Sequence, residues 1–177
     1  MASPLGTRIK KLAKGLSARA AADAFVRAQE DPASVSPTER DKASEFEATV
    51  EAMFLMAAVD GDLSEEEVAQ LCASVDAFSE LDHVATPKRV DTSALLAVLN
   101  DRLAQDGWNR RLASVATRLK DHEARAFAFR LAAGVAFVDD VVAHAEAAAL
   151  EAMASALAID ADESQEILFD VREALFA

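Results

Sequence analysis

The sequence predicts an all-α fold, a single bundle of about seven to eight helices. Tyrosine is absent, and the 177 residues include only 5 glycines and 4 prolines, so helix-forming residues dominate and strand-forming residues are sparse. Hydrophobic residues make up 52% of the chain, which is enough to fill one sizeable core. Apolar residues also recur at spacings of three and four through most of the chain, which is typical of helices that bury one face.

Residues 1–35 are expected to form a basic amphipathic helix and a loop, ahead of the main helical domain at 36–177. Ile9 and Leu12 belong to an apolar stripe along this helix. The basic side chains expected to contact an anionic membrane surface or a protein partner are Arg8, Lys10, Lys11 and Lys14. Alternatively, the stripe covers the core of the protein itself. We favour this second interpretation because most amphipathic helices face a core.

Capping boxes mark the starts of the next two helices. Ser36 and Glu39 have the capping-box spacing, with a proline at the first helical position between them. The buried face expected for this helix consists of Phe46, Val50, Met53, Phe54 and Ala57. Gly61 is typical of the residue just past a helix end, and Ser64 and Glu67 form the second capping box.

The second half of the chain contains further helical patterns. A leucine-rich helix is expected between Asp91 and Gly107, and a shorter helix follows it. Residues 127–138 are apolar nearly all round, so they are predicted to form the central buried helix. Another apolar stripe covers 150–157, and Asp160 resembles the cap of a terminal helix.

An internal repeat organises these elements. The stretch 57–67 recurs in altered form at 136–146, and each copy follows one apolar helical run and precedes another. In each copy an aspartate closes the first run and a glutamate stands seven positions later, as Asp60 with Glu67 and Asp139 with Glu146. Two helix-turn-helix hairpins result, at 45–79 and 124–158. Packing with approximate two-fold symmetry would place their turns on one face.

The acids of the two turns are candidate ligands of a divalent cation such as calcium or magnesium, because these ions prefer several oxygen ligands. The candidates are Asp60, Asp62, Glu67, Asp139, Asp140 and Glu146. The first turn is not an EF-hand, since Gly61 occupies the second position of the loop and Leu71 replaces the bidentate glutamate. Plain helix capping is the alternative. It accounts well for the first turn and poorly for the second, where Ala143 replaces the capping serine.

The two turns with their flanking helices resemble the paired signatures of the bacterial tellurite-resistance TerB family. The matching phrases are MAAVDGDLSEEEVAQL at 56–71 and AGVAFVDDVVAHAEAAAL at 133–150. The resemblance implies an all-helical bundle, a divalent-cation site at the acidic turns, and a role in stress-response or tellurite-linked complexes near the membrane without enzymatic activity. Asp60, Glu67, Asp139 and Glu146 match the signatures, and Asp140 departs from the second.

Other kinds of chemistry have little support in the sequence. His83, His122 and His144 are far apart and show no metal-binding spacing, and Cys72 lies on an apolar stripe, as expected for an inert thiol. No phosphate-binding glycine loop and no Gly-x-Ser-x-Gly motif occur. A net charge of −13 disfavours nucleic acid as a partner. The single cysteine is typical of a protein from a reducing compartment.

Together with the resemblance to the TerB family, these observations predict a non-catalytic accessory or scaffold protein of a bacterial tellurite-resistance or stress-response system, which binds a divalent cation at its acidic turns. The expected location is the cytoplasm or the periphery of the inner membrane. The alternative is a structural or interaction bundle without metal, which the basic N-terminal helix tethers to a membrane or a protein partner. A metal-dependent hydrolase at the same carboxylates ranks last, because no general base with an oriented partner can be named.

Overall fold

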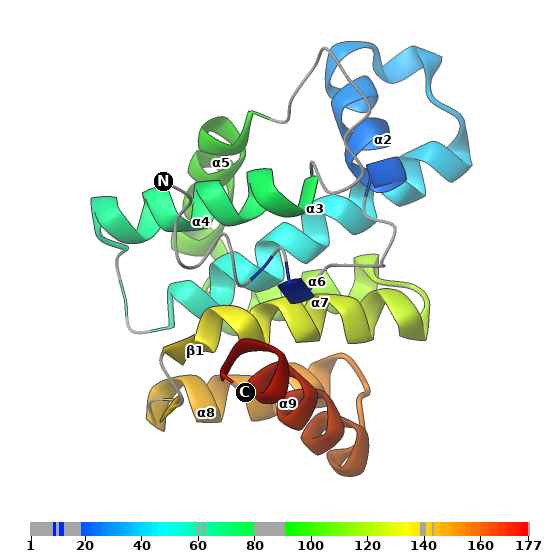
Figure 1. Cartoon of the computed structure of the whole chain (residues 1–177). Helices are drawn as coiled ribbons and strands as arrows, with labels where there is room; N and C mark the ends of the chain where they lie inside the picture. The colour runs from blue at the N-terminus through cyan, green and yellow to red at the C-terminus, as the bar shows by residue number, and fades with distance from the viewer. Residues whose placement is uncertain are drawn as a thin grey trace.

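Eight α-helices make up most of the part of the chain that the computed structural model describes, which is residues 9, 11–12, 19–59, 61, 63–79, 91–138, 141–142 and 144–176. The helices are α2 (Arg19–Glu30), α3 (Pro37–Ala57), α4 (Glu65–Ser79), α5 (Thr92–Asp106), α6 (Trp108–Arg118), α7 (His122–Ala136), α8 (His144–Ala156) and α9 (Ala161–Phe176) (Figure 1). A short 3-10 helix, η1 (Pro32–Ser34), precedes α3, and two two-residue strands, β1 (Phe137–Val138) and β2 (Val141–Val142), follow α7. The predicted all-helical bundle is confirmed.

Most of the helices begin where short polar side chains cap them. The Ser36 hydroxyl accepts a hydrogen bond from the Glu39 amide at 3.2 Å, as the capping box predicts. Three aspartates do the same at α5, α7 and α9, with amide-to-carboxylate distances of 3.1, 2.8 and 2.8 Å at Asp91, Asp121 and Asp160. Gly107, with a φ of +84°, ends α5 and allows α6 to start immediately after it.

Helix α3 is the centre of the bundle. It packs against α2, α4, α5, α6, α7 and α8, and every side chain from 48 to 56 is buried. Residues 127–138 were predicted to form the central buried helix. Helix α7 is largely buried, as predicted, but it ends at Ala136, and α3 packs against more of the other helices than α7 does. Glutamates interrupt the apolar pattern of α3, and the sequence does not reveal that the fold buries one of them, Glu51.

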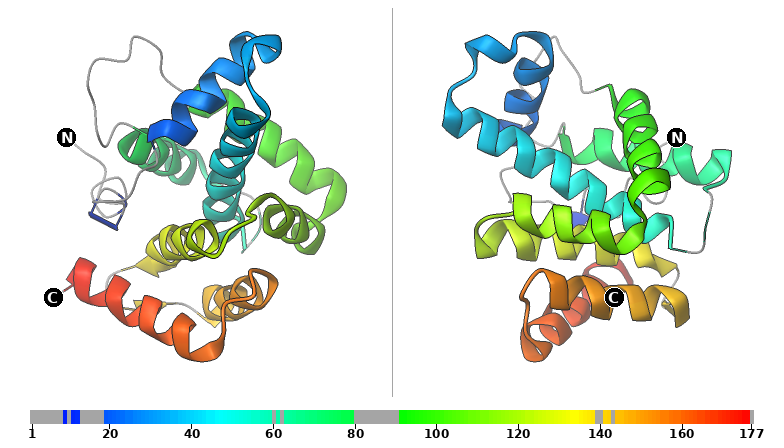
Figure 2. Two further views of the ribbon diagram at one scale, coloured as in Figure 1. Left: turned by 90° about the vertical axis from the view of Figure 1, so that its right-hand side faces the viewer. Right: turned by 180° about the vertical axis from the view of Figure 1, so that it is seen from behind.

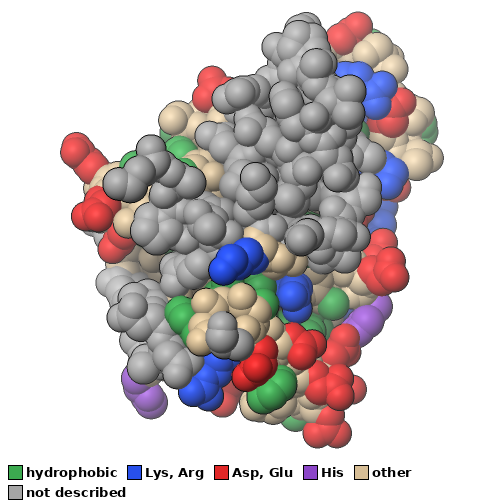
Figure 3. Space-filling model, viewed as in Figure 1, with side chains coloured by type: hydrophobic (Ala, Val, Ile, Leu, Met, Phe, Trp, Pro, Cys, Tyr) green, Lys and Arg blue, Asp and Glu red, His purple; other side chains and the backbone are tan. Residues whose placement is uncertain are grey.

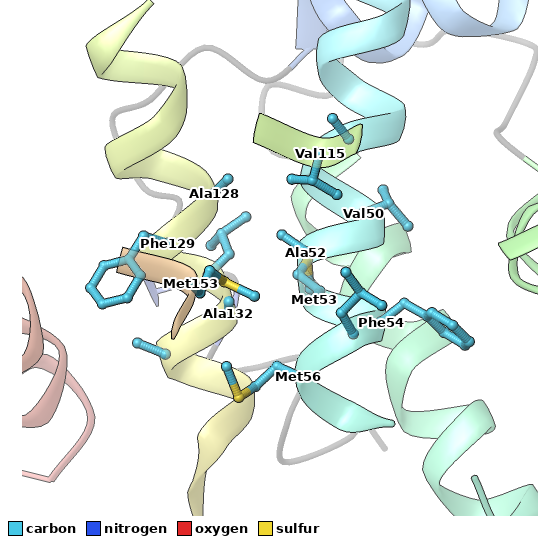
Figure 4. Close-up of a cluster of buried hydrophobic side chains, with 14 of the residues drawn as sticks. Val50, Ala52, Met53, Phe54, Met56, Val115, Ala128, Phe129, Ala132 and Met153 are labelled. Atoms are coloured by element: carbon cyan, nitrogen blue, oxygen red, sulfur yellow. The ribbon is translucent and has the colours of Figure 1, made fainter. Parts of the chain in front are cut away.

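Helices α3 and α7 run parallel and side by side. Ala128 and Ala132 of α7 turn toward α3, and Ala52 and Met56 of α3 turn toward α7 (Figure 4). Small side chains on both helices allow the two backbones to approach closely. Because the helices are parallel, both end at the same end of the molecule, as Figures 1 and 2 also show.

The N-terminal stripe covers the core at the two positions where it is described. Ile9 and Leu12 are 0% and 1% exposed, whereas Lys11 between them is exposed. Both apolar side chains lie against Gly134 of α7, where a Cβ atom would overlap the Leu12 side chain. Arg130 of α7 donates from Nε to the Leu12 carbonyl at 3.2 Å. At these two positions the stripe therefore belongs to the core.

Helix α2 packs against the first half of α3. The rings of Phe25 and Phe46 lie 5.3 Å apart, and Arg27 pairs with Glu39 at 2.5 Å. Within the described residues, no helix has both the length and the apolar character needed to cross a membrane.

Candidate functional site

The first acidic turn of the repeat, within 57–67 and called the first acidic corner below, connects α3 to α4. Gly61 has a φ of +118°, which favours glycine, and this explains the glycine at this turn. Ser64 and Glu67 form a reciprocal capping box, in which each backbone amide donates to the other residue's side chain at 3.1 Å. Asp60 and Asp62 lie outside the described residues. One predicted ligand, Glu67, therefore has a capping role through its Oε2 atom.

The second acidic corner has a different local structure. Helix α7 ends at Ala136, and β1 pairs antiparallel with β2 in the register Phe137 to Val142 and Val138 to Val141. Valine is β-branched and favours extended backbone, so the valines explain why the helix does not continue to residue 138. Asp139 and Asp140 lie outside the described residues.

Glu146 is the predicted ligand that the structure describes at this second corner. It stands in the first turn of α8, where the helix dipole favours a carboxylate. Its Oε2 atom is shielded from solvent. Burial of a carboxylate oxygen increases its interaction with any neighbouring positive charge, because water screens that interaction less.

The parallel packing of α3 and α7 brings the two corners to the same end of the bundle (Figure 1). Among the residues that the structure describes, no three His, Cys, Asp or Glu side chains form a group that could hold a metal ion. Four of the six predicted ligands lie outside those residues, so the cation site stays a prediction.

The basic side chains of the N-terminal segment are described at one position. Lys11 is exposed, as a contact with a partner or a lipid surface requires. Arg8, Lys10 and Lys14 lie outside the described residues, and the predicted contact stays a prediction.

The sequence did not predict a buried ion-pair network between α3 and α6. Glu51 of α3 has a side chain that is 1% exposed. Its Oε2 accepts from Arg111 Nε at 2.7 Å and its Oε1 from Arg111 Nη2 at 2.9 Å, a bidentate pair. Oε1 also accepts from Arg118 Nη2. Two guanidinium groups therefore surround one buried carboxylate.

Further charges extend the network toward the surface and to α5. Glu47 accepts from Arg118 at 3.1 Å and from Arg102 of α5 at 2.5 Å. Asp106, at the end of α5, accepts from Arg111 at 3.0 Å. The network contains three carboxylates and three guanidinium groups, so its charges cancel. Charged groups inside proteins are stabilised by such pairing. The network holds α3, α5 and α6 together.

The sequence contains one signal for this network, the spacing within each pair of charges, although spacing does not reveal that Glu51 is buried. Glu47 and Glu51 are four residues apart on α3, and Arg111 and Arg118 are seven apart on α6, so each pair lies on one face of its helix. The single tryptophan also joins these helices, since Trp108 Nε1 donates to the Leu55 carbonyl at 2.8 Å.

Two groups, Arg111 of the network and Glu45 of α3, have raised pKa values. The hydrogen bond to Glu51 raises the pKa of the Arg111 guanidinium above its ordinary value, against the lowering effect of burial. Arg111 is therefore permanently charged. Burial raises the pKa of the Glu45 carboxyl, and the negative charge of Asp121 raises it further.

One described histidine, His122, and the cysteine form contacts between helices away from the acidic corners, whereas His144 is the first residue of α8 at the second corner. His122 Nε2 lies 2.6 and 2.8 Å from the two carboxylate oxygens of Glu163, which joins the starts of α7 and α9. Cys72 is half-buried on α4, with its Sγ 4.0 Å from Ser93 Oγ on α5.

Acidic side chains gather over α9 on the face shown in Figure 3. The exposed acids of this helix and its cap are Asp160, Asp162, Glu166, Asp170 and Glu173. They account for part of the net charge of −13.

Comparison of the chain with models of protein families, with curated proteins and with solved structures found no match.

Proposed function

We propose that the chain is a non-catalytic accessory or scaffold protein, similar to the TerB family, in a bacterial tellurite-resistance or stress-response system. It binds a divalent cation, calcium or magnesium, at its two acidic corners. The observation that carries the proposal is the parallel packing of α3 and α7, since this places both corners at one end of the bundle. A single cation there would tie the two halves of the repeat together.

The described carboxylates fit a hard cation. Glu67 uses Oε2 for capping and keeps Oε1 as a possible ligand, and Glu146 presents a shielded oxygen in a first helical turn. Carboxylate oxygens are the ligands that calcium and magnesium prefer. Asp60, Asp62, Asp139 and Asp140 would complete the ligand set. The acidic surface around α9 favours the same class of partner, cations and basic proteins, and disfavours nucleic acid.

Calorimetry with calcium and with magnesium tests the cation site. Wild-type protein should release or absorb heat and gain thermal stability, by about 2.7 kcal/mol when the free cation is at about 100 times its Kd. The Asp60→Asn/Asp139→Asn double variant should lose both effects. Asp162→Asn/Glu166→Gln removes two exposed acids of α9 and serves as the matched control, which should behave as wild type. Equal heats for wild type and the corner variant would refute the site.

A second candidate function is a metal-free interaction bundle tethered to a membrane or a protein by its basic helix. The capping box of Ser64 and Glu67 favours it, because capping explains that acid without a ligand. The tether is tested by sedimentation with anionic and neutral vesicles. Deleting the N-terminal segment would also remove Ile9 and Leu12 from the core. The better variant keeps these two residues and replaces the basic residues with glutamine, at Arg8, Lys10, Lys11 and Lys14.

The tether predicts that wild-type protein sediments with anionic vesicles and that the glutamine variant does not. Equal sedimentation of both proteins would refute the tether, whereas the cation site is tested separately by calorimetry. Binding to anionic vesicles would also support a position in the cytoplasm at the inner membrane.

A further inference from the structure

A groove of about 490 Å³ lies between α2, α3 and α5. Figure 2 (right) shows α2, in blue, and α5, in bright green, on the same side of α3. Pockets that bind ligands commonly have volumes of about 300–1,000 Å³. None of the described residues that line the groove belongs to either acidic corner, so an inference about the groove holds or fails independently of the cation site.

The floor of the groove is apolar and firmly held. Phe25 and Leu95 are only 7% and 6% exposed, and Phe25 packs against Phe46 of α3. Val98 of α5 lines the groove and is 44% exposed. Among the described residues, Val98 and Phe169 are the exposed large hydrophobic side chains, and Phe169 does not line this groove. An exposed apolar side chain above a buried apolar floor is a feature of docking sites.

The rim of the groove is acidic. The charged residues that line it, in the part of the chain that the structure describes, are Glu30, Glu47, Asp91 and Arg102. Arg102 is already paired with Glu47 at 2.5 Å. Glu30 is the last residue of α2, where the helix dipole adds negative potential. The described residues that line the groove therefore carry a net negative charge, and walls of low dielectric strengthen the attraction for a cationic group.

We propose that this groove is the docking site for a partner protein, which inserts an apolar side chain flanked by lysine or arginine. The apolar anchor would lie on Phe25, Leu95 and Val98, and the basic side chains would face the acidic rim at Asp91. Charge complementarity selects this partner, because a nucleic acid or an acidic peptide would meet carboxylates of its own sign. Burial of one anchor in such a groove supplies much of the binding energy in complexes of this kind.

Fluorescence anisotropy with a synthetic probe tests the proposal. The probe is a short labelled peptide with leucine at every third or fourth position and lysine elsewhere, and a second peptide carries glutamate in place of each lysine. Measurements in EDTA keep the groove separate from the cation site. The lysine peptide should bind the wild-type chain, and the glutamate peptide should bind at least roughly tenfold more weakly.

Two pairs of variants decide whether binding occurs in the groove. Val98→Arg should weaken binding of the lysine peptide at least roughly tenfold, whereas Phe169→Arg makes the same change outside the groove and should leave binding unchanged. Asp91→Asn removes a rim charge while asparagine still caps α5, so binding should weaken a few-fold at low salt. Asp101→Asn, an exposed acid of α5 outside the groove, should have a smaller effect than Asp91→Asn.

The outcomes that would overturn the proposal are equally specific. Equal affinity of wild type and Val98→Arg, or an equal loss in Val98→Arg and Phe169→Arg, would show that the peptide binds through the overall charge of the chain. Equal binding of the two peptides would remove the role of the acidic rim. Any of these results leaves the calorimetric test of the acidic corners unaffected.

Discussion

Replacing Glu51 with glutamine should destabilise the protein by about 3 kcal/mol. Glutamine has nearly the same shape, so the substitution removes a charge without creating a cavity. Removing one partner of a buried ion pair costs about 3–5 kcal/mol, because the remaining charge stays buried. Here both partners keep a second carboxylate, Asp106 for Arg111 and Glu47 for Arg118, which places the cost at the lower end of that range.

Urea unfolding followed by far-ultraviolet circular dichroism measures this cost. With a urea dependence of about 2 kcal/mol per molar, the midpoint of Glu51→Gln should fall by about 1.5 M. Glu47→Gln is the matched control, because Glu47 lies one turn away, is 20% exposed and pairs with the 37% exposed Arg102. Its cost should be about 1 kcal/mol. A loss below about 1 kcal/mol in Glu51→Gln, or equal losses in both variants, would refute the buried-charge reasoning.

Three further predictions concern other contacts. Leu12→Ala should lower the free energy of unfolding by about 2–5 kcal/mol because Leu12 is buried, whereas Lys11→Ala at the exposed neighbour should change it very little. Equal urea midpoints for the two variants would contradict the packing of Leu12 in the core. Glu45 has a raised pKa in the folded state, so its contribution to stability is complete below pH 4.5 and is lost as the pH rises through that raised pKa. As the pH rises from 4 to 7, the free energy of unfolding of Glu45→Gln should therefore increase relative to that of wild type. Urea unfolding at both pH values tests this, and a difference between the two proteins that does not change with pH would contradict it. Trp108→Phe removes the hydrogen bond to the Leu55 carbonyl and should cost about 1 kcal/mol in thermal or urea unfolding, and an unchanged midpoint would show that the bond contributes nothing.

Helix boundaries were predictable because local chemistry sets them. Each capping side chain accepts a hydrogen bond from an amide three residues away, as at Ser36, Ser64, Asp91 and Asp160. Gly107 adopts a positive φ without the strain that a side chain would cause. None of these effects depends on distant parts of the chain. A sequence pattern read over a few residues therefore contains the relevant information.

The identity of the central helix was not predictable in the same way. Glu51 is acceptable in the interior only because Arg111 and Arg118 reach it from 60 and 67 residues away. Periodicity alone assigns a glutamate to the surface. The short β ladder after Ala136 was missed for a different reason, since the repeat with the first corner favoured a second helical turn over the strand preference of the valines.

The candidate cation site is intermediate between these cases. The repeat predicted two corners, and the parallel packing of α3 and α7 places both at one end of the bundle. Glu67 in its capping box is the point at which local structure competes with the predicted ligand role. Capping uses Oε2 of Glu67, and coordination of a cation would use the other oxygen of the same carboxylate, so a binding measurement separates the two roles.

The pairing of α3 with α7 has a consequence for the newly made chain on the ribosome. Roughly 80 residues must be added after α3 is complete before α7 is complete, which takes about 4–16 s at about 5–20 residues per second. During this interval Ala52 and Met56 have no α7 surface to cover them (Figure 4). The apolar face of α3 is therefore exposed for seconds in the nascent polypeptide, and chaperones that recognise apolar segments have time to bind it.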